Sequence, residues 1–287
     1  MNFSIVIVSY KSSHLIDQHL QTISTNNEVI IIENSLDKKL KEATEKRYSN
    51  VKVIIPDKNL GFGAALNLGI KMSKNIFVMC LAADINFDKQ YLLNIAIILN
   101  DFKEFTIISP TYFDERIHKN YSINKNKGII KVSNFILKEV DELDGANLII
   151  NKKMLNSDVF FDENFFLYYE NIDLCLRLRK KSHKLYAIEN LKFNHLGTQS
   201  SHPSFDSEII MCRNWHYCWS KFYFYRKHFS YFFAIRKTIP NLVRSIKYCI
   251  YFLYKKDDIK FKVHKSELLG LLNAYILKKS FYRPDIS

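Results

Sequence analysis

The sequence predicts a mixed α/β fold built on a mostly parallel β-sheet. Short β-branched apolar runs alternate with helical patterns through the first hundred residues. Each of these runs is nearly continuous in apolar residues, which is typical of strands covered by helices on both faces. A third observation concerns glycine. The chain has only 7 glycines in 287 residues, and three of them fall within residues 61–69, directly before or within a helical pattern.

Four strands are expected in the first part of the chain, at residues 3–8, 29–32, 51–55 and 76–81. Helical patterns lie between or after them at 15–23, 64–72 and 91–100. In sheets of this kind, ligands bind beyond the carboxyl ends of the strands. Ser9, Glu33, the glycine-rich segment and Asp84 each follow a strand. We therefore expect these four places to converge on one site.

The pattern is looser after Ser109. Residues 111–131 are polar and indicate a long loop or an edge hairpin, and Asp144-Gly-Ala precedes a strand at 147–150. A helix is expected within 160–181, and a strand at 186–193 leads to His195. From residue 205 onward the chain is aromatic, basic and helical in period. Two domains are expected, an α/β domain at 1–204 and a helical extension at 205–287.

The net charge of +13 is concentrated in that extension. Residues 205–287 hold 16 Lys and Arg against 6 Asp and Glu, whereas residues 1–204 hold 26 against 23. Such asymmetry indicates an anionic partner at this end of the chain. Nucleic acid is disfavoured because no nucleic-acid-binding motif is present and the aromatic residues follow a helical period. An anionic membrane surface is one interpretation, and a helical subdomain packed on the core with solvated lysines is the other.

Cysteine usage and the hydropathy pattern suggest an intracellular protein. The five cysteines are odd in number and show no CxxC spacing, which favours reduced thiols. The first residues read as a strand and not as a signal peptide, and no run of 18 apolar residues occurs. We expect a cytoplasmic protein, and binding to the inner face of the plasma membrane is one of the two interpretations of its basic extension.

Several residues suggest chemistry, and each has a structural alternative. The glycine-rich turn that contains Gly61 and Gly63 can seat a phosphate at a helix N-terminus, or it is only a tight strand-to-helix turn. Asp84 is a candidate oxygen ligand for a divalent metal, or it caps the next helix. His195 is a candidate metal ligand, or a satisfied core histidine.

Glu170 and Asp173 form the other candidate pair. A carboxylate flanked by aromatic residues can act as a desolvated general base, and these two follow the aromatic run at 160–169. Their spacing with Arg177 also suits a helix face held by an ion pair, which is the structural alternative.

Taken together, these motifs resemble the family 2 glycosyltransferases, in particular their rhamnosyltransferase-like bacterial branch. The resemblance rests on segments spread over the whole chain, which are Ile5-Val-Ile-Val-Ser-Tyr10, Glu33-Asn-Ser35, Asn59-Leu-Gly-Phe-Gly-Ala-Ala-Leu-Asn-Leu-Gly69, Ala82-Ala-Asp84, Asp144-Gly-Ala146, the 165–177 segment, His195 to Ser201, Gly270-Leu-Leu-Asn273 and Ser280-Phe-Tyr-Arg-Pro284.

This resemblance implies a GT-A fold and an inverting, metal-dependent hexosyltransferase of cell envelope polysaccharide or lipopolysaccharide biosynthesis. The donor would be a nucleotide-diphospho-sugar, with rhamnose as the suggested sugar, and the acceptor a glycan or a lipid-linked saccharide. The cofactor would be Mg²⁺ or Mn²⁺. Carried over to this sequence, the donor-binding positions are Ser9, Tyr10, Glu33, Asn59, Gly61, Gly63, Asn67 and Asp84. Gly145 and Ala146 would border the acceptor, and Asp84 and His195 would contact the metal.

Two departures from the family pattern bear on the chemistry. Ala82 and Ala83 precede Asp84, so that turn offers one carboxylate to a metal. Asn171 stands where the family usually has the acidic base, and an amide cannot accept that proton at neutral pH. Glu170 or Asp173 would then be the base, and we favour Glu170. The alternative is a catalytically impaired binding or scaffolding protein of the same pathway.

Overall fold

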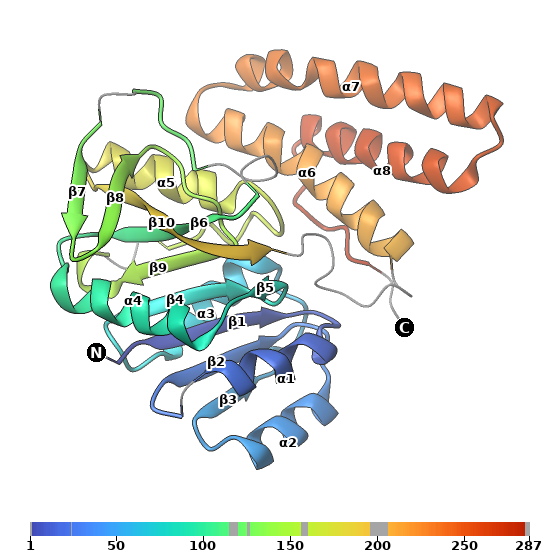
Figure 1. The fold of residues 1–287 in the computed structure, drawn as a ribbon. Helices are drawn as coiled ribbons and strands as arrows, with labels where there is room; N and C mark the ends of the chain where they lie inside the picture. The colour runs from blue at the N-terminus through green and yellow to red at the C-terminus, as the bar shows by residue number, and fades with distance from the viewer. Residues whose placement is uncertain are drawn as a thin grey trace. The chain divides into compact units, whose positions relative to one another are not determined.

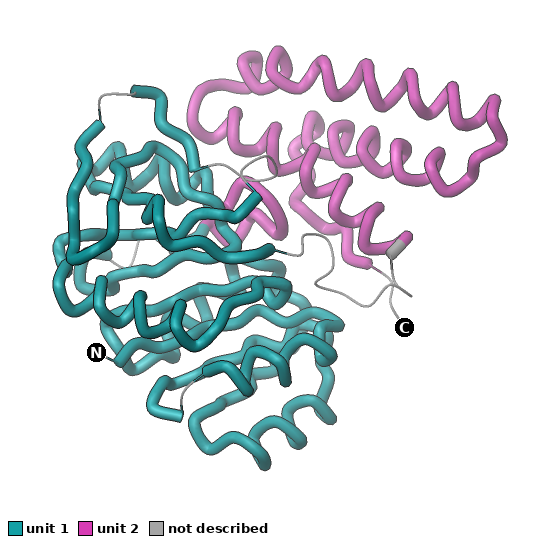
Figure 2. The backbone as a smooth tube through the Cα atoms, in the orientation of Figure 1, with its two compact units in different colours: residues 1–161, 171–202 teal, residues 162–170, 203–287 magenta. Residues whose placement is uncertain are grey.

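The computed structural model describes residues 2–23, 25–114, 120–124, 127–155, 160–195 and 206–284. The chain divides into two compact units, shown in different colours in Figure 2. Unit 1 comprises residues 1–161 and 171–202, and unit 2 comprises residues 162–170 and 203–287. Each unit has its own apolar core and is described separately.

Unit 1 is built on one mixed sheet, to which ten strands contribute among the described residues. The strands are β1 (Ser4–Ser9), β2 (Glu28–Glu33), β3 (Val51–Ile54), β4 (Phe77–Ala82), β5 (Ile85–Asn86), β6 (Ile107–Tyr112), β7 (Ile129–Val132), β8 (Phe135–Val140), β9 (Asn147–Asn151) and β10 (Leu185–His195). Their order is β3-β2-β1-β4-β9-β6-β10-β8-β7, with β5 paired to β10 (Figure 1). The mixed α/β fold with a mostly parallel sheet, expected from the sequence, is confirmed.

Strand direction determines which residues meet at one edge of this sheet. β1 is parallel to β2 and to β4, and β2 is parallel to β3. β9 is antiparallel to both β4 and β6, and β10 is parallel to β6. The carboxyl ends of β1, β2, β4, β6 and β10 therefore lie at one edge, together with the amino end of β9.

Helices cover both faces of the sheet, which explains the continuous apolar strands. They are α1 (Ser13–Thr22), α2 (Lys38–Arg47), α3 (Phe62–Met72), α4 (Lys89–Asp101) and α5 (Glu170–Lys180), with a short 3₁₀ turn, η1 (Lys152–Met154). Side chains along β1 alternate between the two cores: Ile5 and Ile7 belong to the core that includes residues of α1 and α4. Val6 and Val8 belong to the core that includes residues of α3 and α5.

The far side of the sheet ends in a hairpin, which accounts for part of the polar segment at 111–131. β7 and β8 pair antiparallel around a turn in which Ser133 has a φ of 51°. β8 then pairs antiparallel with β10, so the hairpin forms the sheet's edge. Residues 115–119 and 125–126 of the polar segment lie outside the described residues.

Unit 2 consists mainly of three long helices, α6 (Asp206–His228), α7 (Tyr231–Tyr254) and α8 (Asp258–Tyr275). An aromatic core containing Trp215, Trp219 and Phe222 lies among them. Gly270 lets α8 approach α6 closely, because a Cβ at that position would lie 2.3 Å from the carbonyl oxygen of Trp215. Within the described residues, no helix combines the length and the apolar composition needed to cross a bilayer.

Candidate functional site

The first part of the site joins the ends of β1 and β2. The Ser9 hydroxyl donates to Glu33 Oε2 at 2.5 Å, and the backbone N–H of Asn34 donates to the Ser9 carbonyl oxygen at 2.8 Å. Ser35 donates to Glu33 Oε1 through its backbone N–H at 2.7 Å and also through its hydroxyl. The Tyr10 backbone N–H donates to the Ser12 hydroxyl oxygen at 3.2 Å. Both carboxylate oxygens of Glu33 are thus held in place by neighbours at the strand ends.

Glu33 is buried, with 1% of its surface exposed. Burial is the largest influence on its ionisation and raises the pKa of the carboxyl, while the hydrogen bonds from Ser35 and Ser9 act in the opposite direction. A buried, oriented carboxylate at the end of β2 is suited to accept hydrogen bonds from ligand hydroxyl or amide groups.

The glycine-rich turn is connected to the same place through Asn34. The Asn34 side chain donates to the Gly61 carbonyl oxygen at 3.0 Å and accepts from the backbone N–H of Leu60 at 3.3 Å. Gly61 is the N-cap of α3 with a φ of 83°, a conformation that L side chains rarely adopt. The Asn59 side chain accepts from the Gly61 N–H at 3.0 Å. This geometry fits a helix N-terminus presented at the sheet edge.

Asn67 and Gly63, which are further along this segment, make structural contacts. Gly63 is buried in the first turn of α3. The Asn67 side chain donates to the carbonyl oxygen of Phe161 at 2.8 Å and accepts from its N–H at 3.0 Å. Asn67 therefore fixes the segment around Phe161 on α3.

The second part of the site is a carboxylate–imidazole pair. His195 Nε2 lies 3.0 Å from Asp84 Oδ1, and the two side chains are 13% and 3% exposed. The pair forms because β5, directly after Asp84, runs antiparallel to the end of β10 and places Ile85 opposite His195. The strand therefore continues to His195, two residues beyond the predicted end. Residues 196–201 of the predicted motif lie outside the described residues.

The interpretation of Asp84 as a helix cap is wrong. α4 begins at Lys89, and its cap is Asp88, whose side chain accepts from the backbone N–H of Tyr91 at 2.7 Å. Asp84 instead precedes β5 and faces His195. The neighbouring backbone is also fixed, because His19 Nε2 bonds the carbonyl oxygen of Ala83 at 2.8 Å.

Tyr112 and Asp144 extend this pair toward the predicted acceptor side. The rings of Tyr112 and His195 lie 5.8 Å apart, and the Tyr112 hydroxyl donates to Asp144 Oδ1. The same Asp144 oxygen accepts from the backbone N–H of Ala146 at 3.0 Å. Burial, followed by the charge of Asp144, raises the pKa of Tyr112, so this phenol remains protonated and continues to donate.

Asn171 lies against the same turn. Its side chain donates to the Leu143 carbonyl oxygen at 2.8 Å, and a Cβ on Gly145 would lie 3.2 Å from the Cβ of Asn171. The predicted acceptor-side residues Gly145 and Ala146 thus belong to a turn that Asn171 and Asp144 both stabilise.

Asp173 forms the ion pair with Arg177 that the structural alternative predicted. Its Oδ2 accepts from Arg177 Nε at 2.7 Å, so the expected ion pair forms, but the carboxylate is fully buried and not on an exposed helix face. Arg177 also donates to the carbonyl oxygen of Phe160 at 2.5 Å. Asp173 therefore belongs to a buried hydrogen-bonded link.

Glu170, the first residue of α5, is assigned to unit 2 and is 6% exposed. It follows Tyr168 and Tyr169, whose φ values of 65° and 68° are unusual for residues with side chains. Two consecutive residues in this region persist only when their surroundings determine the conformation, and such backbone is concentrated at functional positions.

Three polar residues at this edge were not selected from the sequence, namely Tyr112, Asn34 and Asp144. Asn34 and Asp144 lie in motifs beside selected residues, so their position was an available signal. Tyr112 lies in the segment interpreted as a polar loop or hairpin, and no sequence signal identified it. Their interactions depend on strand pairing that the sequence does not display.

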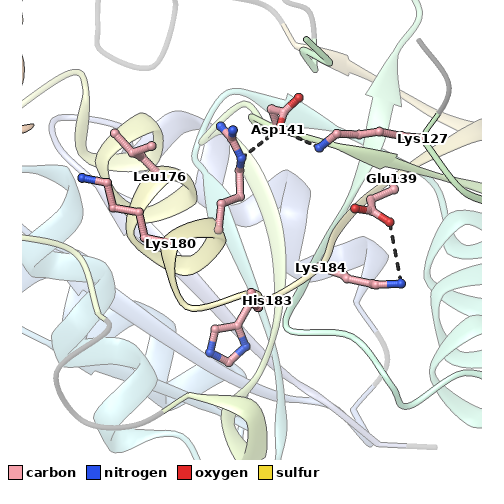
Figure 3. A pocket seen from close by; sticks show the side chains of 9 residues that line it. Lys127, Glu139, Asp141, Leu176, Lys180, His183 and Lys184 are labelled. Atoms are coloured by element: carbon pink, nitrogen blue, oxygen red, sulfur yellow. Dashed lines mark hydrogen bonds and ion pairs between the residues drawn. The ribbon is translucent and has the colours of Figure 1, made fainter. Parts of the chain in front are cut away.

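A separate cavity lies at the other end of β10 from His195. It has a volume of about 390 Å³ and is lined by Lys127, Glu139, Asp141, Leu176, Arg179, Lys180, Ser182, His183 and Lys184. Asp141 forms ion pairs with Lys127 at 2.6 Å and with Arg179 at 2.8 Å. Figure 3 shows Asp141 facing Lys127, and Glu139 facing Lys184. The cavity adjoins the amino end of β10, whereas His195 ends that strand, so it is at the opposite end of the strand.

Comparison with known proteins identifies the family. Residues 4–160, more than half of the chain, match the glycosyl transferase family 2. The chain belongs to this family. The match covers β1 through β9 and includes Ser9, Glu33, Gly61, Asp84 and Gly145.

A relative is the low-salt glycan biosynthesis hexosyltransferase Agl10 of Haloferax volcanii. It is 26% identical over 195 residues, which represent 63% of this chain and 62% of the relative. The similarity thus spans less than two thirds of that protein's length.

Two solved structures share the fold. TarS of S. aureus (residues 1–349) has a TM-score of 0.54 at 14% identity, covering all of this chain and 94% of the other. The mannosyltransferase PcManGT of Pyrobaculum calidifontis, solved with GDP-Man and Mn²⁺, has a TM-score of 0.56 at 11% identity, covering 96% and 87%. The fold is the GT-A glycosyltransferase fold.

Proposed function

We propose that this protein is an inverting hexosyltransferase that uses a nucleotide-diphospho-sugar donor and a divalent metal. The observation that carries the proposal is the buried Asp84–His195 pair, 3.0 Å apart at the edge of the sheet where β1, β2 and β6 also end. Membership of family 2 supports it, as does the hexosyltransferase relative. Rhamnose is the sugar suggested by the sequence resemblance, and it is the first to test.

The residues present fit a divalent ion. A carboxylate oxygen and an imidazole nitrogen are both ligands for Mn²⁺, and Mg²⁺ or Mn²⁺ commonly takes one or two carboxylates with substrate phosphates. Among the described residues, no group of three or more His, Cys, Asp or Glu side chains gathers at one point. Asp84 and His195 would hold the ion, with the donor diphosphate as the remaining source of oxygen ligands. When bound, such an ion supplies Lewis-acid compensation of charge on the leaving diphosphate.

We assign the donor nucleotide to the linked strand ends. Glu33, held by Ser9 and Ser35, would accept hydrogen bonds from the nucleoside, with Tyr10 beside it. The N-terminus of α3, with Asn59 and Gly61, would face the diphosphate, since backbone N–H groups and the helix dipole favour anions there.

We propose Glu170 as the general base. It would accept the proton of the acceptor hydroxyl as that oxygen forms a bond to the anomeric carbon and the bond to the diphosphate breaks on the opposite face. Asp173 is the weaker candidate because its carboxylate is already engaged by Arg177. Asn171 would have a positioning role by holding the turn at Gly145.

The base assignment is tested with Glu170→Gln. Nucleoside diphosphate release is first measured with a panel of UDP-, GDP- and TDP-linked hexoses, including rhamnose, in the presence of Mn²⁺. Turnover should fall by roughly 10²–10⁴-fold with little change in donor binding. Glu163→Gln, at an exposed position, is the control and should retain turnover. Unchanged turnover in Glu170→Gln would refute the assignment.

The metal assignment has a readout independent of activity. Electron paramagnetic resonance of Mn²⁺ with UDP or GDP reports binding directly. Asp84→Asn should weaken Mn²⁺ binding at least about tenfold. Asp88→Asn is the matched control, since Asn also caps a helix and the site is untouched. Equal Mn²⁺ affinity in Asp84→Asn and the wild type would contradict the proposal.

A donor-binding protein without transferase activity is the second candidate. It is motivated by Asn171, whose amide occupies the position where the family pattern has an acid and is bonded to Leu143. Thermal stabilisation by a donor with no detectable sugar transfer or hydrolysis would favour this candidate. Measurable product would exclude it.

We further propose that residues 1–204 form the catalytic domain and that the acceptor is a glycan or lipid-linked saccharide of a surface polysaccharide. A lipid-linked acceptor would be met at a membrane, which is consistent with a cytoplasmic protein bound peripherally at the inner face.

A further inference from the structure

Helix α7 in unit 2 is oriented opposite to the usual arrangement of a surface helix. Its buried residues are small or polar, namely Ala234, Thr238, Asn241 and Ser245. The large apolar residues face outward instead. Ile239, Val243, Ile246, Ile250 and Leu253 are 45%, 59%, 42%, 65% and 65% exposed. We call these five residues the α7 face.

The inward side of α7 is held by specific hydrogen bonds. Thr238 Oγ1 lies 3.0 Å from the Tyr275 hydroxyl of α8, and Lys221 Nζ of α6 donates to Asn241 Oδ1 at 2.7 Å. Ser245 donates to the buried Glu267 carboxylate at 3.0 Å. Rotating α7 to bury its apolar face would break these hydrogen bonds and leave buried polar groups unsatisfied. The hydrogen bonds therefore keep the apolar face exposed.

The face forms a continuous stripe. Its members are spaced by four, three, four and three residues, which places them on one side of a helix. From Ile239 to Leu253 the stripe is roughly 21 Å long at about 1.5 Å per residue, within the 24 residues of α7. An exposed apolar stripe of this length indicates an interaction site.

The charges around the stripe indicate what it binds. α7 contains Arg236, Lys237, Arg244 and Lys247 and no Asp or Glu. Arg236 and Lys247 are both exposed. By helical spacing, each lies on the side of α7 next to the stripe. A second copy of α7 would bring cations against cations with no acidic residue to pair them. An anionic lipid surface meets both requirements, because it accepts apolar side chains and attracts cations.

We propose that the α7 face binds the surface of an anionic bilayer, with α7 lying in the plane of the interface. Ile239, Val243, Ile246, Ile250 and Leu253 would enter the boundary between headgroups and acyl chains. Arg236 and Lys247 would lie at headgroup phosphates. This membrane contact rests on unit 2 alone and does not require the proposed transfer reaction to be correct.

Vesicle flotation of the full chain, without any donor, tests the proposal. Vesicles of about three parts phosphatidylglycerol to seven parts phosphatidylcholine should bind the protein, and vesicles of phosphatidylcholine alone should bind it much more weakly. Raising NaCl from about 0.1 M to about 1 M should weaken the binding, since salt screens the headgroup charge. Equal recovery with both vesicle types would overturn the proposal.

Two paired variants separate the apolar contribution from a general effect of charge. Ile246→Glu with Ile250→Glu should reduce binding to the anionic vesicles at least about tenfold. Two apolar side chains that would enter the bilayer are replaced by anions, which the anionic headgroups repel. The matched control is Leu93→Glu with Ile97→Glu on α4, where exposures are 57% and 41% and the spacing is the same. The control should bind as the wild type does. A similar loss in both pairs would refute the assignment to α7.

The electrostatic contribution has its own variant. Replacing Arg236 and Lys247 by Gln should reduce binding to anionic vesicles by about 25-fold, which is about fivefold for each cation. This variant leaves the apolar stripe intact, so it remains informative if the glutamate pair disturbs folding, which circular dichroism would reveal. Sedimentation velocity tests whether the α7 face instead binds a second copy of this chain. A wild-type dimer that dissociates in Ile246→Glu with Ile250→Glu, without vesicle binding, would show that the face pairs with a second copy and would overturn the proposal.

Discussion

The stability of unit 2 should depend on pH through one buried histidine. His216 on α6 is fully buried, and its Nε2 donates to the Tyr282 carbonyl oxygen at 2.8 Å. Ser280 Oγ lies 3.2 Å from Nδ1. The imidazole therefore fastens the C-terminal segment to α6 in its neutral form, and both nitrogens are used.

Burial lowers the pKa of His216 from 6.5 to about 3, and the nearby Arg283 cation acts in the same direction. The unfolded chain therefore binds a proton at a higher pH than the folded chain does. Stability is present above pH 6.5 and is lost as the pH falls toward the folded pKa. Between pH 7 and pH 5 the expected loss is about 2 kcal/mol of unfolding free energy.

Urea unfolding followed by tryptophan fluorescence measures this loss. The chain has two tryptophans, Trp215 and Trp219, and both lie in α6, so their emission reports on unit 2. His216→Gln keeps a side-chain donor but removes the titrating group. It should lower stability at pH 7 and show about 2 kcal/mol less pH dependence between pH 7 and pH 5.

His14→Gln is the control, at an exposed position on α1 in unit 1, and it should retain the wild-type pH response. The same fall in stability for His216→Gln and the wild type would refute the reasoning. It would mean that other groups produce the pH dependence.

Two substitutions in unit 1 test close contacts. A Cβ on Gly69 would lie 2.2 Å from Val6 Cγ1 in the core, so Gly69→Ala should cost about 1–3 kcal/mol by urea unfolding, despite the higher helix propensity of Ala. Gly128→Ala is the control, because a Cβ there would lie 3.7 Å from the nearest atom, Glu139 Oε2, and stability should change by less than about 0.5 kcal/mol. An equal loss of stability in both variants would exclude the clash at Gly69. Asn171→Asp replaces the donor to Leu143 by an acceptor and should cost about 1–3 kcal/mol without raising transfer, so a stable and more active variant would contradict both the contact and the choice of base.

The layout of the sheet edge was predictable because it depends on local patterns. Apolar runs that end in Ser9 and Glu33 gave the strands and their ends, and parallel direction placed those ends together. Asp84 was found by the same argument. The alternative in which Asp84 caps the helix is wrong because two aspartates, Asp84 and Asp88, precede α4, and the side chain of Asp88 is the one that accepts from a backbone N–H of the first turn.

The Tyr112–Asp144 contact could not be predicted. It depends on β9 inserting antiparallel between β4 and β6, which brings the turn at Asp144 beside the end of β6. Both residues belong to segments separated by about thirty positions, and their pairing is a property of strand order. The same limit applies to α7, because helical spacing alone does not say which side of the helix is buried. The hydrogen bonds of Thr238 and Ser245 determine that side.

The amide at Asn171 has a consequence that reaches beyond proton transfer. It donates to the Leu143 carbonyl oxygen and packs against Gly145, so the residue helps to shape the turn that adjoins Asp144. A carboxylate at position 171 would face that carbonyl oxygen with a second acceptor, and the turn would have to move to relieve the repulsion. Chemistry and fold are therefore coupled at this position. Asn171→Asp therefore changes the turn as well as the charge at this position, and the two effects have to be measured together.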